Sequence, residues 1–147
     1  MTYQINTELA IGAPVAQVWD IIADFPRYPE WNPFILEVVG EVRQGASVRY
    51  RFEFPKGLRI WATAKILRFE PGHELLWAAH FLTPALFNGV HHFRVGAAPE
   101  GGALFQHGEV FSGLALPLIT PILRRDGPAI YAGLNQALAR RVEGPAA

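Results

Sequence analysis

Apolar and polar side chains alternate along the first stretch of the chain. One parity holds Tyr3, Ile5, Thr7, Leu9 and Ile11, and the other holds Gln4, Asn6, Glu8 and Ala10. A period of two is typical of a strand with one buried face, so the pattern predicts a strand over residues 3–11. Pro14 suits the first turn of a helix, and apolar residues recur at helical spacing from Val15 to Ala23, which predicts a helix that ends near Asp24.

The next segment, residues 25–34, is rich in aromatic residues and proline. Its prolines leave room only for a turn or a one-turn helix. Between residues 34 and 113 the pattern predicts six further strands, over 34–42, 47–54, 59–70, 73–81, 86–96 and 103–113. The stretches between them are short and rich in Gly and Pro, which favours hairpins and an antiparallel meander.

The period changes in the last part of the chain, which is predicted to form an amphipathic helix over about residues 117–142. Its apolar positions are Ile119, Ile122, Leu123, Ile130, Leu134, Leu138 and Val142, and its polar positions include Arg124, Arg125, Asn135 and Gln136. Pro128 follows Gly127 and cannot donate a backbone hydrogen bond. The helix is therefore expected to kink or break there and to lift away from the sheet.

Together these elements predict an α+β fold over one domain, residues 1–147. A seven-stranded antiparallel curved sheet wraps around the long C-terminal helix, and two short helices follow the first strand. The chain is long and apolar enough to bury one core, since half of its 147 residues are hydrophobic. A curved sheet that does not close completely can leave an apolar cavity for a small hydrophobic ligand.

Charge and cysteine content narrow the possible partners. Thirteen basic residues balance thirteen acidic ones, which argues against nucleic acid or an anionic membrane as partner. The absence of cysteine excludes disulfides, thiolate nucleophiles and Cys-based metal sites. The first residues carry no export signal and the uncharged run 113–123 is too short to span a bilayer, so we expect a cytoplasmic protein without integral membrane association. Monomer and homodimer both stay open.

The strand parity predicts which side chains face the C-terminal helix. The inward rows are Val48, Tyr50, Phe52 and Phe54; Leu75, Trp77, Ala79 and Phe81; Phe87, Gly89, His91, Phe93 and Val95; and Phe105, His107, Glu109 and Phe111. The outward set includes His92, Arg94, Gln106 and Gly108. Both faces of the strands 86–96 and 103–113 hold apolar residues, so a slip of one residue would exchange these two rows and their register stays open. His91, His107 and Glu109 then stand as polar groups on an otherwise aromatic wall, where each needs a partner.

His91, His107 and Glu109 are the candidate reactive groups. A histidine beside a carboxylate can polarise a carbonyl or act as a general base. The same three groups can instead contact a ligand, satisfy one another or cap the terminal helix as structural groups. Their spacing matches no compact metal signature, and the chain has neither a phosphate-binding Gly-rich loop nor a nucleophile elbow, so we expect no metal and no cofactor.

Four sequence features point to a known group of proteins. They are the run Ile11 to Trp19, the segment Phe25 to Phe34, the strand pair holding Gly89 to Phe93 and Gly108 to Gly113, and the terminal helix with Leu134 to Leu138. In these features the chain resembles small bacterial members of the helix-grip superfamily often called SRPBCC, which includes START lipid-transfer domains, the major birch pollen allergen and polyketide cyclases. The resemblance covers nearly the whole chain and implies the helix-grip fold. It implies no single activity, because members with this fold carry different site residues.

The leading hypothesis is a carrier or sequestering protein that holds a lipid-like, aromatic or polyketide-like molecule. Candidate ligand-binding residues are Trp31, Phe34, Tyr50, Phe52, Trp61, Trp77, His91, Phe93, His107, Glu109, Phe111 and Tyr131. One alternative is a cyclase or dehydratase in which an inward His or Glu is the general acid or base. The other is a protein-interaction module that presents the aromatics of residues 25–34 and binds no small molecule.

Overall fold

A computed structural model describes residues 1–144 of the chain and places seven strands in one antiparallel sheet. The strands are β1 (Thr2–Ile11), β2 (Ile35–Val39), β3 (Ser47–Glu53), β4 (Arg59–Glu70), β5 (Glu74–Phe81), β6 (Phe87–Ala97) and β7 (Ala103–Ser112). The helices are α1 (Val15–Ala23), the 3-10 helices η1 (Phe25–Glu30) and η2 (Pro55–Gly57), and α2 (Leu116–Glu143). The order across the sheet is β1-β7-β6-β5-β4-β3-β2, so the first and last strands in sequence are neighbours.

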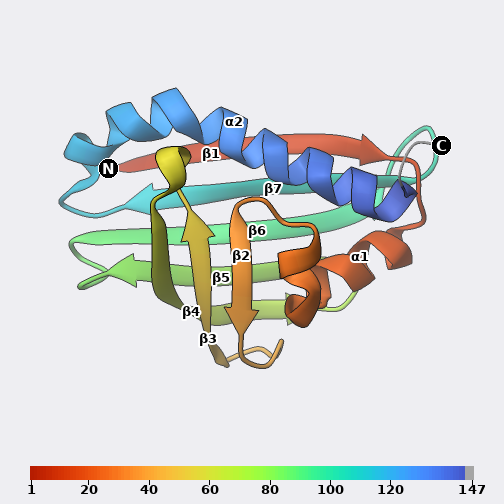
Figure 1. Ribbon diagram of the computed structural model, residues 1–147, viewed down its shortest axis with the longest axis horizontal. Coiled ribbons are helices and arrows are strands. Elements are labelled where there is room, and N and C mark those ends of the chain that lie inside the picture. The colour runs from red at the N-terminus through yellow and green to blue at the C-terminus, as the bar shows by residue number, and fades with distance from the viewer. Residues whose placement is uncertain (145–147) are drawn as a thin grey trace.

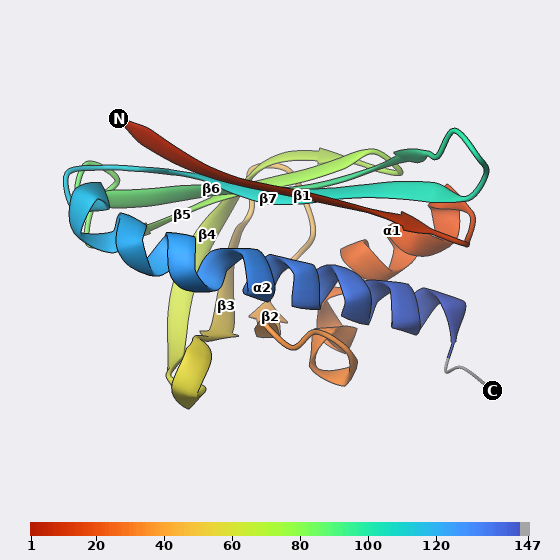
Figure 2. The same cartoon turned by 90° about the horizontal axis from the view of Figure 1, so that it is seen from above.

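The sheet curves around α2, and Figure 1 shows this helix crossing in front of the strands from one end of the molecule to the other. In Figure 2, seen from above, β2, β3 and α1 lie on the same side of the long strands as α2. This arrangement confirms the predicted helix-grip fold. The strand predicted over 34–42 ends earlier, at Val39, because Gly40 turns the chain with a φ of +136°.

The strand register confirms the predicted inward rows. Trp77 pairs with His91 and His91 pairs with Glu109, so these three side chains face α2. The set His92, Arg94, Gln106 and Gly108 faces the convex side, as predicted. His92 is nevertheless buried, because its ring lies over Gly108, which has no side chain.

The prediction that α2 breaks or lifts at Gly127 and Pro128 is wrong. The helix is continuous from Leu116 to Glu143, and Pro128 points to the exposed side. Gly127 is buried against β1 so closely that a Cβ at this position would overlap Ile5 Cδ1. Glycine therefore lets α2 approach the sheet here, and packing compensates for the backbone hydrogen bond that Pro128 cannot make.

Two apolar clusters hold the helix to the sheet. The larger lies under the C-terminal part of α2, where Leu134 and Leu138 pack with α1 and the middle strands. The smaller lies under the N-terminal part and consists of Ile5, Phe111, Leu116 and Tyr131 with partly buried neighbours. Within residues 1–144, the helices are too short or too polar for any of them to cross a membrane.

Candidate functional site

A connected row of polar side chains runs through the core between the sheet and α2. It consists of Thr7 on β1, His91 on β6, His107 and Glu109 on β7, and Tyr131 and Asn135 on α2. We call this set the polar row. The three antiparallel strands bring their inward positions to the same level, and Tyr131 and Asn135 lie one turn apart on the helix face above them.

The amide of Asn135 organises one end of the polar row. Its Nδ2 donates to Thr7 Oγ1 at 2.7 Å, and its Oδ1 lies 2.8 Å from His107 Nδ1. The Thr7 hydroxyl in turn donates to the backbone carbonyl of His107 at 2.6 Å. Because an amide oxygen can only accept, His107 carries its proton on Nδ1.

This tautomer determines the protonation of the next ring. His107 Nε2 is left as an acceptor, so the contact of 2.6 Å with His91 Nε2 is a hydrogen bond that His91 donates. His91 Nδ1 then carries a lone pair, 3.8 Å from Glu109 Oε2. The Tyr131 hydroxyl donates to the same carboxyl oxygen. The row therefore ends in a carboxyl group beside an imidazole lone pair.

Burial shifts the pKa values of the two histidines and of Glu109 in opposite directions. It lowers the pKa of His107 to about 3 and holds the pKa of His91 well below its usual value, and His107 further opposes a charge on His91, so both rings are neutral at pH 7. Burial raises the pKa of Glu109 to about 7, although the hydrogen bond from Tyr131 opposes this shift. Glu109 is therefore the group in the row that gains or loses a proton near neutral pH, as a general acid or base must.

Aromatic rings enclose the two histidines. Phe93 stacks on His91 with ring centres 4.4 Å apart and on His107 at 5.0 Å, while Trp77 meets His91 edge-on at 5.8 Å. Tyr50 stacks on the other side of Trp77 at 5.2 Å. These rings exclude water from the imidazoles and account for the low pKa values of both.

A second group of aromatic side chains is only half-buried and lies on the Glu109 side of the row. Phe34 lies 5.9 Å from Tyr131 and 5.9 Å from Phe52, measured between ring centres. Tyr50 is near enough to Glu109 that this carboxylate raises the pKa of the phenol, after the larger effect of burial. Partial exposure of Phe34, Tyr50 and Phe52 leaves apolar surface next to the carboxyl.

Most of the predicted site residues meet at this row, but three do not. Trp61 lies on the convex face, 42% exposed, because it pairs with outward-facing Arg51 and lies under Arg49 and Arg51. Trp31 packs edge-on against Tyr28 near the other end of α2. Phe111 belongs to the smaller cluster, where it stacks on Phe87.

The space that small residues leave on the sheet is filled by neighbouring side chains. Glu109 Oε1 occupies the position that a Cβ at Gly89 would need. Two hollows stand out in the part of the chain that the structure describes. One, of about 240 Å³, is lined by Asp20, Ile21, Asp24, Arg27, Trp31 and Arg141; the other, of about 270 Å³, is lined by Asn6, Thr7, Glu8, His92, Arg94 and Gln106. Neither is lined by His91, His107 or Glu109.

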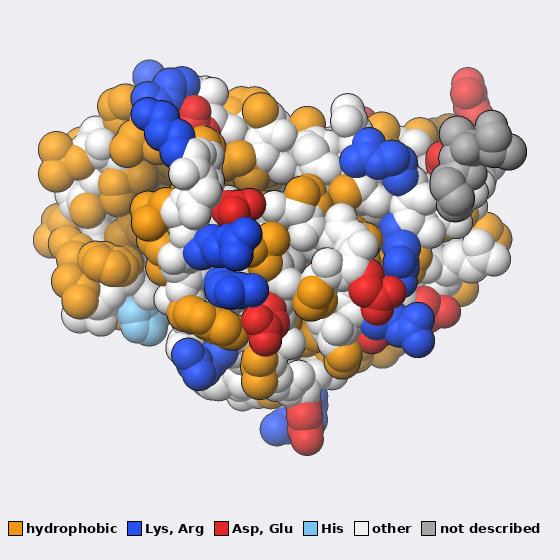
Figure 3. All heavy atoms as spheres, viewed as in Figure 1, with side chains coloured by type: hydrophobic (Ala, Val, Ile, Leu, Met, Phe, Trp, Pro, Cys, Tyr) orange, Lys and Arg blue, Asp and Glu red, His pale blue; other side chains and the backbone are white. Residues whose placement is uncertain are grey.

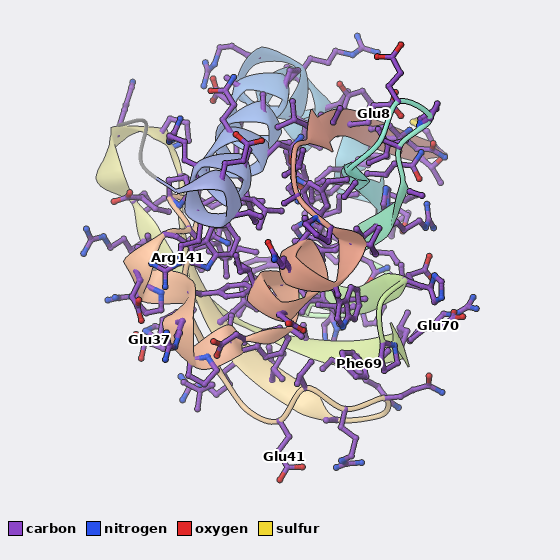
Figure 4. The ribbon with its side chains drawn as sticks, turned by 90° about the vertical axis from the view of Figure 1, so that its right-hand side faces the viewer. Glu8, Glu37, Glu41, Phe69, Glu70 and Arg141 are labelled. Carbon is purple, nitrogen blue, oxygen red and sulfur yellow. The ribbon has the colours of Figure 1, made fainter. Side chains whose placement is uncertain are left out.

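The first hollow lies beside the C-terminal end of α2. Figure 4 looks onto this end, where Arg141 reaches from the helix toward the chain that follows α1. Arg141 pairs with Glu30 at 2.7 Å, and Gly12 N–H donates to Glu143 Oε1 at 2.9 Å. These contacts fix the end of α2 to the β1–α1 connection and to η1.

Two members of the polar row were missed by sequence reasoning. Asn135 was assigned to the polar side of α2, yet it is buried and faces the sheet. Its spacing from Tyr131 and Leu138, four and three residues, places it on the apolar stripe and was a usable signal. Thr7 shares its parity with the apolar residues of β1 and is the only hydroxyl between Ile5 and Leu9, which was the available signal.

The donor set of the row favours acid–base chemistry or ligand contact over metal binding. His91 and His107 are hydrogen-bonded to each other and not turned toward a common point. Within residues 1–144, no group of three or more His, Asp or Glu side chains is arranged to hold a metal ion.

Comparison with known proteins identifies one matching family and many solved structures with a similar fold. The family described as polyketide cyclase / dehydrase and lipid transport matches residues 2–143. No curated protein matches the chain in sequence. The di-domain ARO/CYC StfQ from the steffimycin biosynthetic pathway is similar with a TM-score of 0.76 and 17% identity, covering 97% of this chain and 51% of StfQ. This chain thus spans about half the length of StfQ.

Two other solved structures match over nearly their whole length. A START superfamily protein from Mycobacterium smegmatis has a TM-score of 0.76 at 19% identity, covering 95% of this chain and 97% of that protein. The Zhui aromatase/cyclase from Streptomyces sp. R1128 has a TM-score of 0.70 at 13% identity, covering 97% and 94%. At these identities the likeness shows the fold alone.

Proposed function

Because the chain belongs to the family described as polyketide cyclase, dehydrase and lipid transport, we propose that it binds a small hydrophobic molecule between the sheet and α2. Glu109 and Tyr131 contact the one polar group of that molecule, and the half-buried rings of Phe34 and Phe52 contact its apolar body. The family and its fold fit a role in hydrophobic ligand binding or cyclisation. The carrier role is the one that the site supports best.

The observation that carries this proposal is the unsatisfied half of the Glu109 carboxyl. Among residues 1–144, only Tyr131 forms a hydrogen bond to this carboxyl, and it does so at Oε2. Oε1 lies over Gly89 and is available to a hydroxyl or carbonyl group of a ligand. Within the described part of the chain no Lys or Arg pairs with Glu109, and burial keeps this carboxyl protonated up to about pH 7, so it can donate as well as accept.

Entry of the ligand requires the side chains at this site to move, because the described hollows lie elsewhere. The N-terminal part of α2 is the element best suited to move. It is attached by the smaller cluster, and it carries Pro121 and Pro128, each of which removes a helical hydrogen bond. A displacement there opens the space between Tyr131 and Phe34 while the C-terminal part stays packed.

Native mass spectrometry of the chain purified from its own host tests the proposal. We expect one hydrophobic adduct per chain, released on denaturation. Glu109→Gln and Tyr131→Phe should reduce its occupancy, because each removes a polar contact while keeping the shape of the side chain. Tyr3→Phe, which removes a hydroxyl outside the polar row, should leave it unchanged. Adduct-free protein that also binds no added naphthol would contradict the proposal.

A second candidate function is favoured by the lone pair of His91 that faces Glu109 at 3.8 Å. As a carboxylate, Glu109 can remove a proton from the carbon next to a ligand carbonyl and return it to a β-hydroxyl group. That hydroxyl then leaves as water and a carbon–carbon double bond remains. His91 would accept a hydrogen bond from the carboxylic acid form of Glu109 during this step.

Glu109→Gln distinguishes a carrier from a dehydratase. If the recovered adduct is converted with loss of water by the wild-type chain, an enzyme is expected to lose this turnover in Glu109→Gln while still binding the molecule, although more weakly. A carrier returns the adduct unchanged with either chain. Thermal unfolding of the variant shows whether a loss of binding follows from a loss of folding.

A further inference from the structure

Exposed apolar side chains gather at one end of the molecule, at the turn after β5 and the start of α2. They are Phe81, Leu82, Leu114, Leu118 and Ile122, and we call them the end patch. The two segments lie side by side, because Leu114 N–H donates to the Ala85 carbonyl at 2.9 Å. Figure 3 shows hydrophobic side chains covering this end, at the left of the view.

The helical members of the end patch form a stripe. Leu118 and Ile122 are four residues apart on α2, so they lie above one another on one side of its first turns, and Leu114 lies in the turn directly before the helix. The Leu118 side chain is 81% exposed. Scattered exposed leucines are common, but a contiguous group from two segments is typical of a surface that contacts a partner or a membrane.

Leu82 adds a second observation, since its backbone is strained. Its φ is +61°, in the left-handed region that favours glycine, and its side chain is 73% exposed. Hydrogen bonds fix this turn, from Thr83 N–H to Phe81 O at 2.7 Å and from Leu86 N–H to Thr83 Oγ1 at 3.2 Å. A leucine here strains the backbone and buries only a small part of its side chain within the described residues, which points to a contact outside them.

The net charge beside the end patch is positive, because two arginines and one carboxylate follow the stripe along α2. Residues 75–99 and 110–125 contain no Asp or Glu, and Arg124 and Arg125 follow the stripe directly. The next carboxylate along the helix, Asp126, pairs with Arg125 at 2.8 Å. The zero net charge of the whole chain conceals this local excess of positive charge, which favours anionic headgroups.

We propose that the end patch docks this protein onto the surface of a lipid bilayer that contains anionic headgroups. Phe81 and the leucines enter the interfacial region, while Arg124 and Arg125 contact headgroup phosphates. A second copy of the chain is a poorer partner, because two-fold pairing would bring the arginines of both copies together. The proposal does not depend on the proposed function, since no residue of the polar row belongs to the end patch.

Co-sedimentation of the full chain with vesicles of equimolar phosphatidylcholine and phosphatidylglycerol tests this docking. Wild type is expected to sediment with the vesicles, and Leu118→Ser and Leu82→Gly should each weaken the partition about tenfold, because each removes one inserted side chain. Leu82→Gly also relieves the backbone strain, so its thermal stability should not fall. Arg124→Glu and added salt should weaken binding as well.

Val39→Ser and Leu67→Ser are the matched controls. Both side chains are exposed, by 53% and 44%, and lie on β2 and β4 outside the end patch, so their loss should leave sedimentation unchanged. Failure of the wild type to sediment overturns the proposal, as does equal weakening by the controls. A wild-type dimer that Leu118→Ser converts to a monomer, without vesicle binding, overturns it too and assigns the patch to a second copy.

Discussion

The two parts of α2 meet the sheet in different ways. The C-terminal part, residues 132–143, places Leu134 and Leu138 in the larger cluster, and Arg141 and Glu143 tie its end to η1 and to the β1–α1 connection. The N-terminal part, residues 116–131, rests on the smaller cluster and exposes a stripe of apolar side chains. The first part is built to stay packed, and the second combines weaker attachment with the edge of the polar row. The difference predicts that this helix serves as core at its C-terminal end and can move as a cover at its N-terminal end.

The largest expected effect is a difference in stability between truncations in the two parts. Leu138→Ala should lower the free energy of unfolding by about 3 kcal/mol, because it empties a fully buried position. Leu123→Ala, at a partly buried position over the smaller cluster, should cost about 1 kcal/mol. Urea denaturation of both variants measures the two values. Equal losses would mean that the two parts are held equally firmly.

The next effect is a dependence of stability on pH that comes from Glu109. Its pKa is about 7 in the folded chain and 4.5 in the unfolded chain, so the folded state holds the proton more tightly. Its contribution to stability is complete below about pH 4.5 and is lost as the pH rises to about 7. Glu109→Gln cannot ionise, so its stability relative to wild type should rise by about 2–3 kcal/mol between these pH values.

His91 and His107 affect the pH dependence of stability in the opposite sense to Glu109, so the wild type has to be compared with Glu109→Gln at each pH. The pKa values of His91 and His107 are lowered by folding, so the unfolded chain binds more protons than the folded chain as the pH falls below 6.5. The free energy of unfolding should therefore fall in acid for both the wild type and Glu109→Gln. A constant difference between the two proteins from pH 4.5 to pH 7 would show that Glu109 ionises normally.

A somewhat smaller loss is expected when the amide of the polar row is removed. Asn135→Leu keeps the size of the side chain but leaves the Nδ1–H of His107 without a partner, which should cost about 2 kcal/mol of stability. Gln136→Leu, at the exposed neighbouring position, should change stability little. Nitrogen NMR of the imidazoles should also show that His107 no longer favours the Nδ1–H tautomer. An unchanged tautomer would remove the role assigned to Asn135.

The smallest expected effect concerns the hydroxyl of Tyr131, which lies where the N-terminal and C-terminal parts of α2 meet. The hydrogen bond from Tyr131 lowers the pKa of Glu109, so Tyr131→Phe should raise that pKa by about one unit above its wild-type value. A carboxyl-carbon NMR titration measures the change, with Tyr3→Phe as the control. An unchanged or lower pKa would contradict the contact between Tyr131 and Glu109.

Much of this fold could be predicted from the sequence because strand parity is a local signal. The alternation in β3 followed from period two alone, whereas both faces of β6 and β7 are apolar, so their inward register is settled only by the pairing in the sheet. The resemblance to the helix-grip superfamily is confirmed by the family match over residues 2–143. The course of α2 could not be predicted from Pro128, because tertiary packing of Gly127 on Ile5 keeps the helix straight enough to continue.

The site was predictable only in part. Parity placed His91, His107 and Glu109 on one wall, but the row became visible only when α2 supplied Tyr131 and Asn135 from above. Trp61 was grouped with the wall because it is aromatic, and this grouping is wrong. It pairs with Arg51 across β3 and β4, whereas inward-facing Tyr50 pairs with Ala62, so Trp61 faces outward. Strand parity carries no information on Tyr131 and Asn135, because both residues come from α2.

Hydrogen exchange of α2, followed by mass spectrometry with and without added naphthol, tests the central claim most directly. We expect residues 116–131 to exchange faster than residues 132–143 in the free protein, and naphthol to slow exchange in the first part because it binds beneath Tyr131. Equal exchange in both parts, or protection by naphthol confined to the hollow beside Arg141, would contradict the account.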